Sequence, residues 1–163
     1  MPRKSSEKRV PYSAAQMFDL VADVEAYPSF IPWCQALRIV SRESDGQSEG
    51  DDGSNAGEVG AERFIADMIV GFRLFREKFR SDVALDRARR RINTTYVSGP
   101  MRSMASHWRF DDDGAGGSIV RFEIDFAFRN PLLQRAAQAV FDEAFGKMAD
   151  AFVKRAHVVY GEA

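Results

Sequence analysis

The chain has very few of the side chains from which catalytic and metal sites are usually built. It contains one cysteine, Cys34, and two histidines, His107 and His157, among 163 residues. One cysteine excludes an internal disulfide and a multi-cysteine metal site. Cys34 follows an aromatic, proline-rich segment, so we expect a buried thiol with a raised pKa rather than a nucleophile. We expect each histidine to be a surface residue or a hydrogen-bonded one, because the two lie far apart in the sequence.

Recognised catalytic motifs are also lacking. The sequence has no G-x-S-x-G elbow, no P-loop and no dinucleotide fingerprint. We therefore identify no catalytic residue, expect no metal and no cofactor, and favour binding over turnover.

Long hydrophobic runs are lacking as well. Residues 1–9 are polar and do not resemble a secretory signal. No stretch approaches the ~20 apolar residues that cross a bilayer. We therefore expect a cytoplasmic protein, with a peripheral contact at the inner membrane left open. The formal net charge of −1 gives no indication of a nucleic-acid partner, and we expect no DNA binding.

What the chain has in quantity is phenylalanine, with 13 residues. A length of 163 residues is most simply one domain, so we treat residues 1–163 as a single unit. Within it, residues 44–57 are almost devoid of apolar side chains, and we expect a mobile surface loop there. That loop is either a tolerated insertion or a docking element.

The last third of the chain carries the clearest pattern. Aromatic and charged residues alternate from Val120 to Phe128, which predicts a strand with one apolar face. Asn130 and Pro131 suit the N-cap and the first position of a helix. Apolar residues then recur at steps of three and four as far as Tyr160, and Gly161 is placed to end the helix. A helix of that length needs a surface on which to bury its apolar stripe.

The upstream pattern predicts a sheet that supplies this surface. We expect a strand at 4–10, a helix at 14–24 and further strands at 36–43, 62–70, 72–85, 89–97 and 101–110, with Gly71 at a tight connection. A run of strands followed by a helix indicates the α+β class with a curved antiparallel sheet of about six to seven strands.

The side chains that face each other across this sheet and helix are unusually bulky, and a gap between them would form an apolar ligand pocket. Packing as an ordinary core is the alternative, and spacing alone favours it. The polar candidates are Glu77, Tyr96, Ser106 and Tyr27. The other residues that we expect to line the site are Phe30, Trp33, Phe75, Phe79, Met104, Trp108, Phe122, Phe126, Phe141, Phe145, Met148 and Phe152.

One strand also carries a basic stripe on its opposite phase, formed by Arg73, Arg76, Lys78 and Arg80. The stripe is either a solvated outer face or a contact for anionic membrane or RNA phosphate.

The segment Asp23-Val24-Glu25-Ala26-Tyr27-Pro28-Ser29-Phe30-Ile31-Pro32-Trp33-Cys34 resembles the signature of the coenzyme Q-binding family of START-like proteins. That family is similar to the ribosome association toxins and sits in the polyketide cyclase/dehydrase-like superfamily. The likeness covers about residues 4–161, and residues 44–57 look like an insertion relative to it. It implies a helix-grip fold, in which the sheet wraps the C-terminal helix around a hydrophobic tunnel.

The resemblance also implies that the protein binds a ligand without catalysing a reaction. Its ligand would be ubiquinone or another isoprenoid lipid, bound in support of respiration or quinone synthesis, with the basic stripe facing anionic membrane. A regulator that binds the large ribosomal subunit is the alternative. A cyclase-type enzyme that uses Glu77 or Tyr96 as acid or base is a third hypothesis.

Overall fold

The structure is a computed structural model that describes residues 3–31, 33–44, 61–72 and 75–161. The strands and helices follow one another along the chain as β1 (Arg3–Val10), α1 (Ala14–Ala22), the 3₁₀ helix η1 (Val24–Ser29), β2 (Cys34–Ser44), β3 (Ala61–Phe72), β4 (Phe75–Asp86), β5 (Arg91–Ser98), β6 (Met101–Asp112), β7 (Ser118–Phe128) and α2 (Pro131–Tyr160). The expected loop at 44–57 falls, apart from residue 44, outside the described residues.

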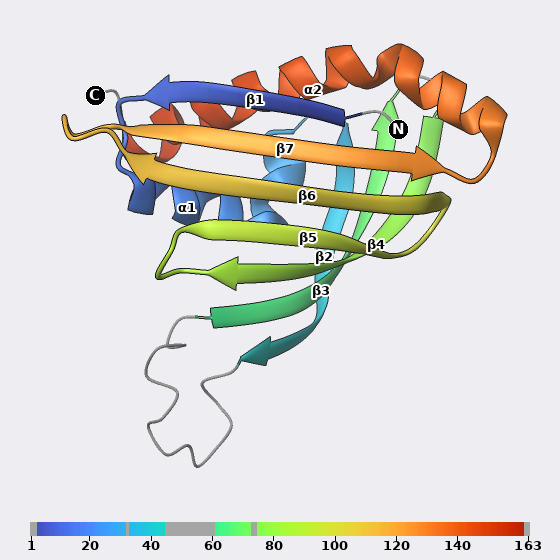
Figure 1. The fold of residues 1–163 in the computed structure, drawn as a ribbon, viewed down its shortest axis with the longest axis horizontal. Coiled ribbons are helices and arrows are strands. Elements are labelled where there is room, and N and C mark those ends of the chain that lie inside the picture. Colours follow the sequence, from blue (N-terminus) through green and yellow to red (C-terminus); the bar gives the residue numbers. More distant parts are fainter. Residues whose placement is uncertain (1–2, 32, 45–60, 73–74, 162–163) are drawn as a thin grey trace.

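The strands form one seven-stranded sheet in the order β1-β7-β6-β5-β4-β3-β2, and all neighbours are antiparallel. The sheet is open and strongly curved, and α2 runs along its concave side (Figure 1). The short helices α1 and η1 lie on the same side of the sheet as α2, and α1 lies near the C-terminal end of α2 (Figure 1). The predicted α+β class and curved antiparallel sheet are therefore confirmed.

The β3–β4 connection corrects one prediction. We expected the turn at Gly71, but β3 continues to Phe72, which pairs with Phe75 across the hairpin. Gly71 serves a different purpose within the strand. The Gln35 side-chain amide occupies the space that a Cβ atom would take there, so glycine allows a close approach.

The first helix is also shorter than predicted. It begins at Ala14, as expected, with Ser13 and Gln16 forming a capping box, but ends at Ala22 instead of Val24. The chain then tightens into η1, which contains Pro28. A proline lacks the amide hydrogen that a continued α-helix would need, so the segment turns in 3₁₀ form and stops.

The ends of α2 follow the prediction closely. The Asn130 side chain accepts hydrogen bonds from the amides of Leu132 (2.8 Å) and Leu133 (3.3 Å), and Pro131 is the first helical residue. Gly161 caps the other end with a positive φ of 83°. Such a φ costs glycine little, because it has no Cβ.

The C-terminal end of α2 is tied to the start of α1. The buried hydroxyl of Tyr12 donates to the Gly161 carbonyl (2.6 Å) and lies 2.5 Å from Nδ1 of His157. The Tyr160 hydroxyl donates to the Gln16 carbonyl (2.8 Å). These contacts hold the last turn of α2 next to the start of α1.

The buried side chains fall into two clusters along α2. The larger lies beneath its C-terminal half and includes Phe18, Phe110 and Phe152. The smaller lies beneath its N-terminal half and includes Phe79, Phe126 and Ala137. The apolar stripe of α2 therefore bridges two separate packing regions.

A search of the described residues finds no helix both long and apolar enough to cross a membrane.

Candidate functional site

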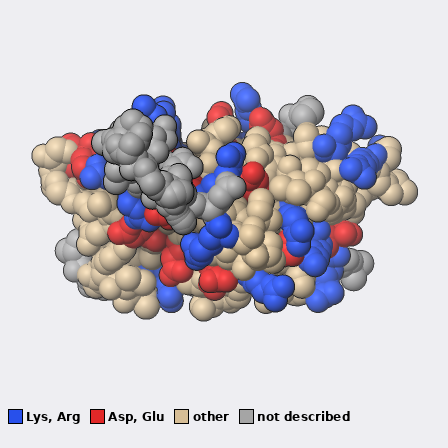
Figure 2. All heavy atoms as spheres, turned by 90° about the horizontal axis from the view of Figure 1, so that it is seen from below, with Lys and Arg blue, Asp and Glu red and all other residues tan. Residues whose placement is uncertain are grey.

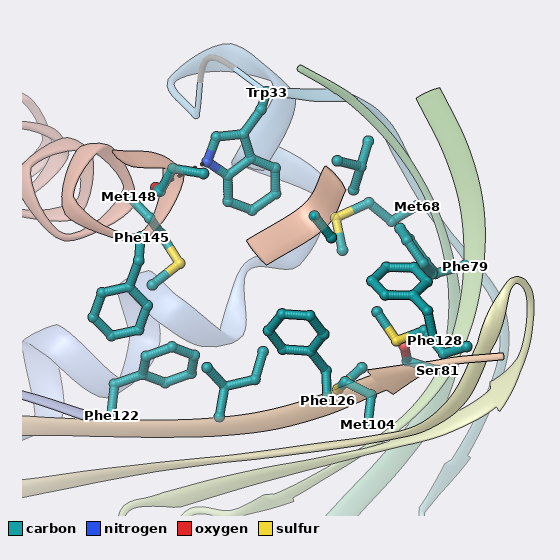
Figure 3. A pocket seen from close by; sticks show the side chains of 15 residues that line it. Trp33, Met68, Phe79, Ser81, Met104, Phe122, Phe126, Phe128, Phe145 and Met148 are labelled. Carbon is teal, nitrogen blue, oxygen red and sulfur yellow. Dashed lines mark hydrogen bonds between the residues drawn. The ribbon is translucent and has the colours of Figure 1, made fainter. Parts of the chain in front are cut away.

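A cavity of about 190 Å³ lies between the concave face of the sheet and the N-terminal half of α2. Figure 3 shows side chains from the sheet, from α2 and from the η1–β2 segment converging on it. The residues that line it are Trp33, Met68, Val70, Phe79, Ser81, Met101, Met104, Phe122, Ile124, Phe126, Phe128, Ala137, Ala144, Phe145 and Met148. The two buried clusters therefore do not close fully against each other.

Strand alternation explains why these residues share one wall. Met68 and Val70 of β3 lie opposite Phe79 and Glu77 of β4, and side chains directly opposite in an antiparallel pair share a face. Phe122, Ile124, Phe126 and Phe128 follow at steps of two along β7. The wall therefore consists of every second residue of neighbouring strands.

Small residues on α2 leave the space open. Ala137 and Ala144 line the cavity from α2, together with the larger Phe145 and Met148. A methyl group reaches only a short way toward the sheet, so the gap beneath it remains unfilled. Met68, Met101, Met104 and Met148 contribute flexible thioether chains, which adapt to ligands of different shape.

Ser81 provides the polar side chain of this wall. Its residue is 7% exposed, and among the described residues its hydroxyl has no recorded hydrogen-bond partner. A hydroxyl on an otherwise apolar wall can donate a hydrogen bond to an acceptor of a bound molecule. Figure 3 places Ser81 beside Phe79 and Phe128 at the sheet side of the cavity.

Trp33 covers the cavity from the side of the η1–β2 segment. Its indole Nε1 donates to the Ala144 carbonyl at 3.2 Å, which joins the segment to the middle of α2. The next strand holds the same segment in place, because the Gly71 amide donates to the Trp33 carbonyl (2.9 Å). The tryptophan is therefore fixed at both its side chain and its backbone.

Seven of the site residues predicted from the sequence line this cavity. They are Trp33, Phe79, Met104, Phe122, Phe126, Phe145 and Met148. The side chains of Phe75 and Phe141, two further candidates, lie outside what the structure describes.

Four predicted aromatic residues come together elsewhere. Phe152 contacts the rings of Tyr27, Phe30 and Trp108 edge-on, with centroid separations of 5.2, 5.3 and 5.3 Å. The Tyr27 hydroxyl donates to the Val21 carbonyl (2.5 Å), and burial raises the pKa of that phenol. This cluster packs beneath the C-terminal half of α2, at one end of the cavity instead of on its wall.

The polar candidates take different positions. The Tyr96 hydroxyl accepts a hydrogen bond from the amide of Met101, a wall residue, at 3.0 Å, but Tyr96 does not line the cavity itself. Ser106 is buried but does not line the cavity. Glu77 lies opposite Val70 near the β3–β4 hairpin and is partly exposed, so its carboxylate can remain hydrated.

Eight lining residues were not predicted, although some left a signal. Phe64, Ala66, Met68 and Val70 alternate along β3, a period of two that points to an inward face. Ile124 and Phe128 continue the alternation that already included Phe122 and Phe126. No local pattern marks Ala137 and Ala144 as cavity residues, because small residues occur on any face of a helix.

The basic stripe is largely engaged by neighbouring groups. Arg80 forms two hydrogen bonds with Asp67, at 2.7 and 2.9 Å, and these lower the pKa of that carboxyl. Lys78 lies 3.7 Å from the same carboxylate, and Arg76 donates to the Gln35 side chain (3.0 Å). Arg73 lies outside the described residues. Figure 2 shows basic and acidic side chains interspersed on the face that it presents.

The groups considered for catalysis lie apart from the cavity. Cys34 is 3% exposed, and burial raises the pKa of its thiol to about 11, which confirms the expected buried thiol. His107 contacts Asn93 (2.7 Å) and His157 contacts Tyr12. Among the described residues, the cavity wall contains one hydroxyl and no titratable side chain. This wall is suited to contact with apolar groups, and its described residues offer no acid–base pair.

The amino-acid sequence is similar to those of several known proteins over most of its length. A family profile described as polyketide cyclase / dehydrase and lipid transport matches residues 10–153. The ribosome association toxin RatA of Escherichia coli K12 is 32% identical over 160 residues, which cover 98% of this chain and 90% of the relative. The mitochondrial coenzyme Q-binding protein COQ10 homolog B of Xenopus laevis is 27% identical, covering 96% of this chain and 59% of the relative.

Solved structures agree with the fold. The 18 kDa protein CC1736 of Caulobacter crescentus is 33% identical with a TM-score of 0.78, and the match covers 99% of this chain and 100% of that one. A START superfamily protein of Mycobacterium smegmatis superposes with a TM-score of 0.75 at 18% identity, over 96% of this chain and 98% of that one. The curved sheet that grips α2 is thus the START-like fold, and the chain belongs to the polyketide cyclase / dehydrase and lipid transport family.

Proposed function

We propose that this protein binds an apolar ligand without transforming it, and that the ligand is ubiquinone or a polyprenyl precursor. The observation that carries the proposal is the cavity between sheet and α2, whose wall is aromatic and thioether with one hydroxyl from Ser81. Ligand pockets combine such apolar walls with a few placed polar groups. A quinone ring fits this pattern, because its flat faces are apolar and its carbonyl oxygens accept hydrogen bonds.

The size of the cavity limits what it holds in this state. A protein cavity of about 150 Å³ accepts benzene, so about 190 Å³ suits one ring or a short isoprenoid segment. Most sites for larger ligands exceed about 300 Å³. A long tail therefore extends out of this volume, unless α2 moves away from the sheet and the methionine side chains adjust to it.

The physiological role that we propose is support of respiration or quinone synthesis at the inner membrane, with the protein itself in the cytoplasm. The likeness to a protein named for coenzyme Q binding supports this role.

A paired substitution on α2 tests the binding site. Ala137 is 7% exposed and lines the cavity, whereas the adjacent Ala136 is exposed. Leucine at 137 adds three carbons to the open space, so Ala137→Leu should weaken binding of a short-chain ubiquinone about tenfold. Ala136→Leu should leave it unchanged.

Binding is measured by quenching of tryptophan fluorescence and by the rise in melting temperature, and organic extracts of the purified protein are searched for lipid by mass spectrometry. The proposal fails if extracts contain no lipid and ubiquinone neither quenches the fluorescence nor raises the melting temperature.

A second candidate function is association with the large ribosomal subunit. It is favoured by the 32% identity to a ribosome association toxin across 98% of this chain. Co-sedimentation with purified large subunits tests it, and binding through phosphate contacts should weaken steeply with added salt. Absence from the subunit fraction at moderate salt would exclude this function.

An enzyme of the cyclase type has less support. Neither Glu77 nor Tyr96 lines the cavity, and the Tyr96 hydroxyl already accepts the Met101 amide. A measurable turnover that Glu77→Gln abolishes would restore this hypothesis.

A further inference from the structure

A second hollow, of about 370 Å³, lies beside the start of α2. The residues that line it are Arg102, Ala127, Phe128, Arg129, Pro131, Gln134 and Gln138. Phe128 also lines the apolar cavity, so the two spaces lie next to each other. An elongated molecule that spans both would contact the apolar wall at one end and the two arginines at the other.

This second hollow carries positive charge that none of its described lining residues neutralises. Arg102 and Arg129 are both exposed, and neither has a recorded ion pair or side-chain hydrogen bond among the described residues. No acidic residue belongs to the described lining. This contrasts with Arg80, which is held by Asp67. Two unpaired guanidinium groups that share one hollow attract an anion.

A bulge in β6 explains why Arg102 lines the second hollow. The register of β6 against β7 shifts between Met101 and Ser103, which leaves Arg102 as the additional residue of a bulge. A bulge turns a side chain away from the direction that regular alternation would give it. Arg129 follows the last residue of β7, and its amide lies 3.4 Å from the Pro100 carbonyl.

Gln134 joins the start of α2 to the end of β7 beside this hollow. Its Oε1 accepts a hydrogen bond from the Phe128 amide (2.6 Å), which fixes the orientation of the side-chain amide. Its Nε2 is enclosed and has no partner among the described residues, so it does not face a ligand in the hollow. The cations available to such a ligand are therefore Arg102 and Arg129.

We propose that this hollow binds the phosphate or diphosphate headgroup of an amphiphile whose apolar tail lies in the cavity beyond Phe128. Arginine suits this headgroup, because its planar guanidinium group bonds phosphate oxygens in pairs. The inference rests on the proposed function and narrows its ligand. Ubiquinone is uncharged and would leave the hollow empty, whereas a polyprenyl precursor with an anionic head occupies both spaces.

Calorimetric titrations with three probes measure the contributions of the headgroup and of the tail to binding. The probes are geranyl diphosphate, geraniol and inorganic pyrophosphate. Geranyl diphosphate should bind at least about tenfold more tightly than either of the others. The Arg102→Gln/Arg129→Gln double variant should lose this advantage and keep its affinity for geraniol. Arg135→Gln is the matched control, because Arg135 is exposed on α2 outside the hollow, and it should bind all three probes as the unaltered protein does.

Two results would overturn the inference. One is equal affinity of the double variant and the unaltered protein for geranyl diphosphate. The other is pyrophosphate binding as tightly as geranyl diphosphate, which would identify a site for a free anion. Failure of the proposed function looks different, since neither geraniol nor ubiquinone would then bind, while the arginine dependence of pyrophosphate binding could still be measured.

Discussion

The indole nitrogen of Trp33 donates a hydrogen bond to the carbonyl oxygen of Ala144, with 3.2 Å between the two atoms. Ala144 lies within α2, where its carbonyl is also the natural acceptor for the helix amide four residues later. Trp33 therefore holds α2 at the point where the helix passes over the cavity. The bond links the aromatic, proline-rich segment directly to the candidate site.

Trp33→Phe should remove this bond while an aromatic ring remains on the cavity wall. The expected loss of stability is about 1 kcal/mol, the net contribution of a typical hydrogen bond, measured by urea denaturation. The variant should also lose most of the quenching by ubiquinone, because Trp108, the other of the two tryptophans, does not line the cavity. Trp108→Phe is the control and should keep the quenching.

Cys34 should be unreactive in the folded protein. It is 3% exposed, and burial raises the pKa of its thiol to about 11, so little thiolate exists near pH 8. A chromogenic disulfide reagent should react slowly in buffer and rapidly in denaturant. The raised pKa also means that the thiol's contribution to stability is complete below about pH 8.5 and falls as pH rises toward 11. Rapid labelling of the native protein would contradict this.

Phe152→Ala should be among the most destabilising substitutions on α2. The ring is 4% exposed and contacts the rings of Tyr27, Phe30 and Trp108. Removing it leaves a cavity and costs about 3–5 kcal/mol. Val158→Ala on the same helix removes a side chain that is 74% exposed and should change stability by less than about 0.5 kcal/mol. Similar unfolding midpoints for both variants would contradict the packing described.

The Asp67–Arg80 pair should make the free energy of unfolding depend on pH at acid pH. Arg80 lowers the pKa of Asp67 in the folded protein, chiefly through its hydrogen bonds. The contribution is therefore present above the unfolded value of about pH 3.9 and is lost as pH falls through the lowered pKa. The urea midpoint should fall less steeply with acid in Asp67→Asn than in the unaltered protein. Parallel curves for the two proteins would show that the pair contributes little.

Much of the architecture could be predicted because the signals are local. Asn130, Pro131 and Gly161 mark both ends of α2 by their own backbone preferences, and the structure places them as expected. Alternation along β6 and β7 likewise identified Trp108 and Phe122 as inward residues. The exception is Gly71, which usually indicates a turn but here makes room for Gln35 of the neighbouring strand β2, a residue far away in the sequence.

The candidate site was harder to predict, because a cavity is defined by what fails to fill it. Phe152 and Phe145 both lie on the apolar side of α2, yet one is packed among aromatic rings and the other borders open space. The difference depends on the curvature of the sheet beneath them and on small residues such as Ala137. No pattern within the helix reports that curvature.

The uneven support of α2 has a mechanical consequence. Its last turn is anchored by Tyr12 and Tyr160 and its first turn by the hydrogen bond from the Phe128 amide to Gln134, whereas the stretch around Ala137 and Ala144 passes over empty volume. A helix that is held at both ends and unsupported between them yields most in the middle. A ligand larger than the present void would therefore be admitted where Ala137 and Ala144 lie, against the resistance of the hydrogen bond between Trp33 and Ala144.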